Sequence, residues 1–405
     1  MTEPRRLSRR GLLAGITAST ALGSASLSAL AASSPATRTL LSQEPKNYTA
    51  ITQTDRNDTI QVLVSLKHQT MQVFAGIEEI GSSEISSGKP GKETPHGIFS
   101  VISKHEFRWS NLYVREPMPF MQRLTWSGIA LHAGELPGHP ASHGCVRMPE
   151  KFAEQLYELD TSDRHVIVAD EPTEPKIVSH PRLLLPRDAP KLSEKGSEFS
   201  AILPDFPKAP EAPSSPLRIL LTRLTGREKM ANAQKILSRL GYQVGKPDGL
   251  VGRKTWRAIF EFQKSIGMET PDGALSDETY AAIRSTKGAD KYPDGHLYVR
   301  LRQKPLFDLA VDLKDPDTPL GDHLLSLTPC QDGKSVKWLS VSLNENTAQA
   351  GLDAFLRFTI PADIRQRLMS MLSLHSSIAI SDAGLGRETG KGTDFVVVTH
   401  NPADH

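Results

Sequence analysis

Apolar and polar residues alternate over the first well-patterned part of the chain, as they do in half-buried β-strands. Val62, Val64 and Leu66 share one face of a first strand, which a turn joins to a second arm. Further segments with strand character lie at 71–74, 98–102, 128–132 and 165–169. Helical spacing occurs once, after Pro149, where a helix can begin. The sequence therefore predicts a mostly-β domain over residues 59–170, with one helix near its end.

Helical spacing dominates the next patterned region, 217–286. Its apolar positions recur every three or four residues, as at Ala233, Ile236, Leu237 and Leu240. The segment 248–259 aligns without a gap with 272–283, and both halves open on an Asp-Gly turn. Ser276 precedes acidic residues and is an expected helix N-cap. A small three-helix bundle containing a short repeat is the prediction for this region.

The last region, 292–400, mixes both patterns and predicts an α+β domain. Strands are expected over 296–311 and 395–399, and a helix over 362–372. Thr318-Pro319-Leu320-Gly321 repeats the form of Thr94-Pro95-His96-Gly97, again between strand-like segments. One interpretation is a degenerate copy of the first domain without its reactive cysteine. The fold class is thus multidomain, with a mostly-β domain, a helical bundle and an α+β domain.

Proline marks the boundary between the first domain and the rest. Residues 171–216 are rich in proline, which lacks a backbone N–H and restricts the residue before it. We interpret this segment as a linker, or as a strap over a neighbouring domain.

The first 32 residues resemble a targeting segment. A basic start containing Arg9 and Arg10 is followed by an uncharged stretch, 11–32, and by an Ala29-Leu30-Ala31 cleavage pattern. Ser8-Arg9-Arg10-Gly11 resembles the bacterial twin-arginine signal. The expected location is the periplasm or cell envelope, with no stable membrane span after cleavage. An uncleaved amphiphilic N-terminus is the alternative.

Composition and charge exclude several classes of protein. Hydrophobic residues make up 38% of the 405 positions, which is too little for a polytopic membrane protein. The formal net charge of +2 argues against a nucleic-acid binder. Two cysteines, Cys145 and Cys330, provide neither a disulfide scaffold nor a four-cysteine zinc site.

One segment, 132–149, concentrates the reactive side chains. A cysteine and histidines together suit acyl transfer, in which a thiolate attacks a carbonyl and an imidazole moves the proton. Cys145 precedes the expected helix, where negative charge is favoured, and a nearby imidazolium would lower its pKa. Backbone N–H groups at Gly144 and Cys145 are candidate oxyanion donors. A His–His–Cys zinc site is the alternative, although no fourth protein ligand is evident. We expect no metal and no cofactor.

The motifs of this region resemble the YkuD-type L,D-transpeptidases of bacterial cell walls. The signature is Ser142-His143-Gly144-Cys145-Val146-Arg147, preceded in the right order by Thr94-Pro95-His96-Gly97, Met118-Pro119-Phe120 and Leu131-His132-Ala133-Gly134. The resemblance covers about 110 residues of the chain. Two departures are the short spacing from His132 to Cys145 and the alanine that follows His132.

The resemblance implies a role for each matching residue. Cys145 corresponds to the nucleophile and His132 to the general base. His143 and Gly144 correspond to positions that shape the nucleophile loop and the oxyanion hole. Arg147 corresponds to a position near the substrate.

Two further residues, Tyr113 and Ser142, are expected to bind substrate. Tyr113 can donate a hydrogen bond to an oxyanion, but an aromatic residue near a strand also packs. Ser142 either orients a histidine or satisfies local backbone groups. Most of the named apolar residues of 217–286 are expected in its core, and a binding role for any one of them is the alternative.

The helical repeat resembles the peptidoglycan-binding module of cell-wall enzymes. Together, the resemblances imply an exported L,D-transpeptidase that acts on peptidoglycan stem peptides through an acyl-cysteine. Its amine acceptor could be a stem peptide, a D-amino acid or the N-terminus of an outer-membrane protein. The alternatives are a carboxypeptidase or endopeptidase that uses water, and a wall-binding structural protein with an idle catalytic domain.

Overall fold

The computed structural model describes residues 48–52, 58–110, 116–159, 164–186, 215–224, 226–289, 292–330, 335–344, 347–390 and 392–400. The expected signal segment, most of the Pro-rich segment, and Tyr113 lie outside these ranges. Among the described helices, none has both the length and the apolar character needed to cross a membrane.

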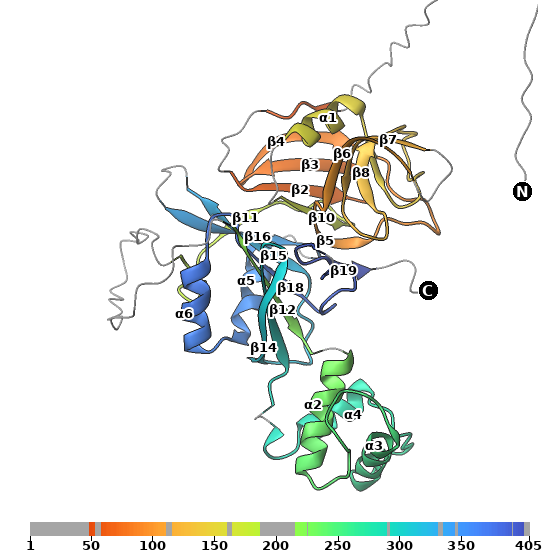
Figure 1. Cartoon of the computed structure of the whole chain (residues 1–405), viewed down its shortest axis with the longest axis vertical. Helices are drawn as coiled ribbons and strands as arrows, with labels where there is room; N and C mark the ends of the chain where they lie inside the picture. The colour runs from red at the N-terminus through yellow and green to blue at the C-terminus, as the bar shows by residue number, and fades with distance from the viewer. Residues whose placement is uncertain are drawn as a thin grey trace, which may run out of the picture. The chain divides into compact units, whose positions relative to one another are not determined.

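The first sheet contains seven strands in the order β1-β4-β3-β2-β10-β5-β19 (Figure 1). Their bounds are β1 Tyr48–Thr49, β2 Ile60–Ser65, β3 Thr70–Ala75, β4 Glu78–Glu84, β5 His96–Ser100, β10 His165–Ala169 and β19 Val397–His400. The predicted hairpin is confirmed, because β2 pairs with β3 in antiparallel register. β10 lies parallel to β2, so the chain returns to this sheet after a long excursion.

That excursion forms a second, four-stranded sheet in the order β6-β7-β8-β9. The strands are β6 Ser103–Trp109, β7 Pro117–Arg123, β8 Ala130–Ala133 and β9 Val146–Met148. Helix α1, Glu150–Glu158, begins after Pro149, as predicted, and Pro149 is its N-cap. Phe152 and Leu156 of α1 are fully buried in a core with Leu131 and Val146. This packing fixes β8 and β9, which carry the reactive segment.

The C-terminal sheet has eight strands in the order β11-β16-β15-β18-β12-β13-β14-β17. They are β11 Lys176–Val178, β12 Leu217–Arg223, β13 Gly295–Leu301, β14 Lys304–Leu313, β15 His323–Pro329, β16 Val336–Ser342, β17 Phe358–Thr359 and β18 Ser377–Ser381. Two helices, α5 Ala348–Leu356 and α6 Ala362–Met371, accompany it. Trp338 and Leu184 are buried in its core.

Three segments lie in different units from those expected. β12 was expected in the helical region but belongs to the C-terminal sheet, and β11 and Leu184 show that part of the Pro-rich segment packs there. β19 was expected in the C-terminal domain but joins the first sheet. Each departure arises from strand pairing between residues far apart in sequence, which local patterns do not encode.

Helices α2 Gly226–Arg239, α3 Arg253–Ser265 and α4 Asp277–Arg284 lie between β12 and β13 in the chain and share their own apolar core. The repeat has a physical basis in two glutamines. Gln234 accepts from the Gly249 N–H and donates to the Thr255 hydroxyl, at 2.8 and 2.9 Å. Gln263 accepts from the Gly273 N–H and donates to Thr279, at 2.8 and 3.0 Å.

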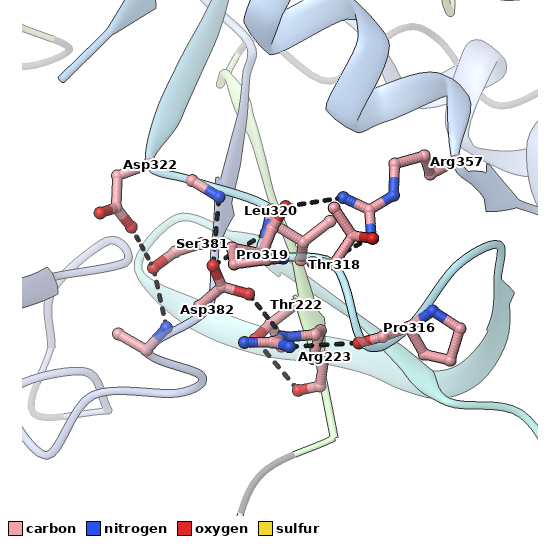
Figure 2. Close-up of polar contacts among 12 residues, drawn as sticks. Thr222, Arg223, Pro316, Thr318, Pro319, Leu320, Asp322, Arg357, Ser381 and Asp382 are labelled. Atoms are coloured by element: carbon pink, nitrogen blue, oxygen red, sulfur yellow. Dashed lines mark hydrogen bonds and ion pairs between the residues drawn. The ribbon is translucent and has the colours of Figure 1, made fainter. Parts of the chain in front are cut away.

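The second Thr-Pro-x-Gly segment, 318–321, sits in a polar network that Figure 2 shows in close-up. The Asp382 carboxylate accepts the N–H groups of Leu320 and Gly321, at 2.8 and 3.1 Å, and pairs with Arg223 at 2.6 Å. Arg357 donates to the carbonyls of Thr318 and Pro319, at 2.7 and 2.8 Å. These groups satisfy one another, so this segment is a packed loop.

Candidate active site

The reactive residues lie on two neighbouring parallel strands. His132 of β8 is the partner of Arg147 of β9, and Cys145 immediately precedes β9. Cys145 and His132 line one cavity of about 750 Å³. Cys145 precedes helix α1, as predicted, but strand β9 lies between them, so the thiol is not at the helix N-terminus.

The loop before Cys145 is held by its own hydrogen bonds. The buried Ser142 hydroxyl donates to the Cys145 carbonyl at 2.5 Å and accepts from the Gly144 N–H at 3.1 Å. Ser142 therefore satisfies local backbone groups, one of the two roles considered for it. Thr94 adds a bond from its hydroxyl to the Gly144 carbonyl, at 2.9 Å.

Gly144 occupies a position that requires glycine. Its φ of +110° is a conformation that L side chains rarely adopt, and a Cβ there would lie 2.7 Å from Ile129 Cδ1. Its N–H group is already bonded to Ser142, which leaves the Cys145 N–H as the better candidate donor to an oxyanion.

His132 is buried, and its hydrogen bonding defines its tautomer. Nδ1 lies 2.8 Å from the carbonyl oxygen of Ala133, which can only accept, so Nδ1 carries the proton. Nε2 therefore has a free lone pair. Burial lowers the pKa of His132, so the ring is held neutral at pH 7. The residue has the protonation state that a general base requires.

Cys145 is partly buried. Its thiol donates a weak hydrogen bond to the Gly128 carbonyl, with 3.7 Å between sulfur and oxygen. Burial raises the pKa of the Cys145 thiol to about 11. The expectation of a lowered pKa is wrong, because desolvation, the largest influence, outweighs the lowering effect of the Ala130 N–H and of the Arg147 charge.

The other predicted residues take different places. Arg147 also lines the cavity and forms an ion pair with Glu116, both side chains being partly shielded. His143 lines the same cavity. Tyr113 belongs to the loop 111–115, outside the described residues, so its role stays a prediction.

Sequence reasoning missed two contributions to this cavity. Glu116 was not recognised as the partner of Arg147, although it lies next to the Met118-Pro119-Phe120 motif. Residues 386–388 of the C-terminal region also line the cavity, and no local signal places them there.

Solved L,D-transpeptidases align with part of this chain. One from Mycobacterium smegmatis shares 20% identity over 27% of this chain and 58% of its own, with a TM-score of 0.26. One from Mycobacterium tuberculosis H37Rv shares 26% identity over 27% and 57%, with a TM-score of 0.26. One from Stackebrandtia nassauensis shares 23% identity over 32% and 60%, with a TM-score of 0.25. The chain thus spans less than two thirds of each of these structures.

Family models match two separate regions. Residues 59–168 match the YkuD model, described as an L,D-transpeptidase catalytic domain. Residues 226–283 match a model described as a peptidoglycan binding domain. Both matches coincide with the regions where the motifs were found, so both resemblances are confirmed. The chain carries a YkuD-type L,D-transpeptidase catalytic domain and a peptidoglycan-binding domain.

Proposed function

We propose that this protein is an exported peptidoglycan L,D-transpeptidase that forms an acyl-cysteine on a stem-peptide donor and transfers it to an amine acceptor. One observation carries the proposal: a cysteine and a neutral histidine with a free Nε2 line the same cavity. That pair is sufficient for acyl transfer by thiol chemistry.

The proposed reaction conserves atoms and protons at each step. Cys145 Sγ attacks the carbonyl carbon of the amide that follows an L-centre, and the thiol proton moves to His132 Nε2. The C–N bond breaks, the departing D-amino acid takes that proton on its nitrogen, and a thioester remains. The acceptor amine then attacks the thioester, loses a proton to His132, and the released thiolate recovers it.

The thiol pKa of about 11 affects the first step. At pH 7 very little thiolate exists in the free enzyme, so Cys145 needs its base during attack. The Cys145 N–H is the proposed oxyanion donor, in a loop fixed by Ser142 and Gly144. Arg147 is proposed to face the substrate while Glu116 orients it.

The other regions fit the same proposal. A module that holds the enzyme on its polymeric substrate raises the local substrate concentration. Residues 226–283 would do so, and residues 1–32 would direct export to the periplasm by a twin-arginine-type signal. We propose that the chain consists of a catalytic domain, a Pro-rich segment, a helical module and an α+β domain. Outer-membrane protein acceptors are a further option for the amine.

Product analysis tests this function directly. Purified enzyme is incubated with a tetrapeptide muropeptide as donor, with and without an added D-amino acid. Exchange of the terminal residue, or a cross-linked dimer, supports transfer. Release of the terminal residue without exchange would instead support the carboxypeptidase, and no turnover would favour the wall-binding protein with an idle catalytic domain.

A further inference from the structure

The catalytic and C-terminal sheets share one topology. Five adjacent strands of the first follow the order β4-β3-β2-β10-β5, and five of the second follow β14-β13-β12-β18-β15. In both sheets the first three strands in the chain form an antiparallel meander, β2-β3-β4 and β12-β13-β14. The fourth strand is β5 or β15, and the last, β10 or β18, lies between the first strand and the fourth. That last strand is parallel to the first and antiparallel to the fourth in both sheets.

The agreement extends to individual residues. The first residues paired between the parallel strands β10 and β2 are His165 and Gln61. In the C-terminal sheet, the first residues paired between β18 and β12 are Ser377 and Arg218. The register between β3 and β4 shifts after Val73, and Val73 is itself paired with the third residue of β2. In the C-terminal sheet the register between β13 and β14 shifts after Val299, which is likewise paired with the third residue of β12.

The last strand of each sheet also ends on an equivalent aspartate. Asp170 follows β10 and pairs with His96 of the first Thr-Pro-x-Gly segment, at 3.1 Å. Asp382 follows β18 and accepts the N–H groups of Leu320 and Gly321 in the second such segment (Figure 2).

Equivalent residues of the two sheets lie in the interface that joins them. Leu63 and Leu220 hold the same place in their sheets and share one buried cluster, as do Ile167 and Ala379. His165 Nε2 lies 3.3 Å from the hydroxyl oxygen of its counterpart Ser377. Contacts between equivalent residues characterise a two-fold interface, so the two sheets pack as two copies of a dimer do.

The copies also exchange strands. The chain leaving β10 adds β11 to the C-terminal sheet, beside β16. The chain leaving β18 adds β19 to the catalytic sheet, beside β5 (Figure 1). Gly97 permits this approach, because a Cβ there would lie 1.9 Å from the carbonyl oxygen of Val397.

This exchanged arm brings Glu388 to the catalytic cavity. The Glu388 carboxylate accepts the N–H of Trp126 at 2.7 Å and that of Ser127 at 3.2 Å. Charge-assisted bonds of this kind are stronger than neutral ones. These residues form the turn closed by the Gly128 N–H on the Thr125 carbonyl, at 3.2 Å. The Gly128 carbonyl of the same turn accepts the Cys145 thiol.

The C-terminal copy has no cysteine at the place of Cys145. In the catalytic domain the nucleophile lies shortly before the helix that leads into the last strand. The corresponding helix is α6, and Cys330 instead follows β15 directly. The segment between Cys330 and β18 contains no cysteine, so this copy cannot use the same chemistry.

We propose that the C-terminal domain is a non-catalytic copy of the catalytic sheet whose exchanged arm, residues 384–390 and 392–400, completes the active site. Within it, Glu388 is a positioning residue that holds the turn 125–128 and, through Gly128, the thiol of Cys145. The expected loss of acyl transfer in Glu388 variants rests on the proposed function, but the expected change in the reactivity of the Cys145 thiol does not. The peptidoglycan-binding module is then an insertion in the first hairpin of this copy, between β12 and β13.

The test is the rate of Cys145 alkylation by iodoacetamide as a function of pH, in the full chain. Glu388→Ala leaves the turn held only by its local bonds, such as those from the Gly128 and Ile129 N–H groups to Thr125. The Gly128 carbonyl then moves off the thiol more readily, and the thiol gains water. We expect the midpoint of the profile to fall by at least about one pH unit, which raises alkylation at pH 7.5 about tenfold. Acyl transfer should fall at least about tenfold in kcat, with little change in KM. Labelled Cys145 is quantified by peptide mass spectrometry, separately from Cys330.

Two further variants make the result decisive. Glu388→Gln retains an oxygen acceptor and should lower the midpoint of the alkylation profile by less than Glu388→Ala does. If the alanine variant does not fold, the glutamine variant provides the test. Glu154→Ala removes an exposed carboxylate on α1 and should leave the profile unchanged. Wild-type midpoints in folded Glu388 variants would overturn the proposal. Absence of transfer in the wild type would contradict only the proposed function, since alkylation requires none.

Discussion

The Cys145 thiol donates to the carbonyl oxygen of Gly128, 3.7 Å away, and only the protonated nucleophile can make this contact. A carbonyl accepts a hydrogen bond from a thiol but has none to give a thiolate. Burial also favours the protonated form. It outweighs the backbone N–H of Ala130 and the charge of Arg147, which lower the thiol pKa, and raises that pKa to about 11. The resting cavity is therefore lined by a neutral thiol and a neutral imidazole, and charge separates only when substrate is attacked.

Removal of the sulfur tests the nucleophile. We expect Cys145→Ala to reduce acyl transfer by at least about 10³-fold, since no other nucleophile replaces the thiol. The melting temperature should change little because the side chain is small. Transfer is measured with the tetrapeptide donor, and Cys330→Ala is the matched control. Activity of the Cys145 variant within tenfold of wild type would remove this residue from the mechanism.

The pH dependence tests the base. His132 acts only when neutral, and burial places its pKa below the usual 6.5, so activity persists to lower pH than an exposed histidine would allow. We expect the acidic limb of kcat/KM, which reports the free enzyme, to have its midpoint below pH 6.5. His139→Ala, at an exposed loop position, should leave that limb in place. A midpoint at or above 6.5 would argue against a buried neutral base.

Local sequence patterns predicted the first hairpin and the motif of the candidate active site. Val62 and Val64 alternate within one strand, and Ser142 to Arg147 are contiguous, so short windows reveal both the hairpin and the site motif. The contact of Glu388 with Trp126 joins residues far apart in sequence, and no window contains both. The Cys145 pKa could not be anticipated for the same reason, because it depends on burial by neighbours that only the fold brings together.

Gly144 provides a test of the nucleophile loop. Its alanine variant combines the left-handed backbone strain, about 1 kcal/mol or more, with a clash against Ile129. We expect Gly144→Ala to lower both stability and transfer. Gly138→Ala is the matched control, since its φ is +84° but nothing lies within 4 Å of the added methyl. Calorimetry and turnover on both variants separate the two effects, and equal losses would show that the clash is unimportant.

Gly97 tests the docking of the exchanged arm. A methyl group there would meet the Val397 carbonyl at 1.9 Å, so Gly97→Ala must displace β19 from β5. We expect faster hydrogen exchange at the β19 amides and weaker transfer, because the arm carries Glu388. Gly76→Ala, with φ +63° and open space around it, controls for backbone strain alone. Unchanged exchange in β19 would contradict the pairing of these strands.

The insertion of the helical module between β12 and β13 allows it to be excised without breaking the sheet. The Leu224 N–H donates to the Asp294 carbonyl at 2.9 Å, so the two ends of the insertion already face each other. Replacing residues 226–292 with a short Gly-containing turn should close the hairpin. We expect the shortened protein to retain transfer on soluble muropeptides and to lose both co-sedimentation with, and activity on, insoluble peptidoglycan, since only the polymer benefits from tethering. The Cys145→Ala full-length protein should still co-sediment and serves as the binding control. An equal loss on soluble and insoluble substrates would instead make the module a structural support of the C-terminal sheet.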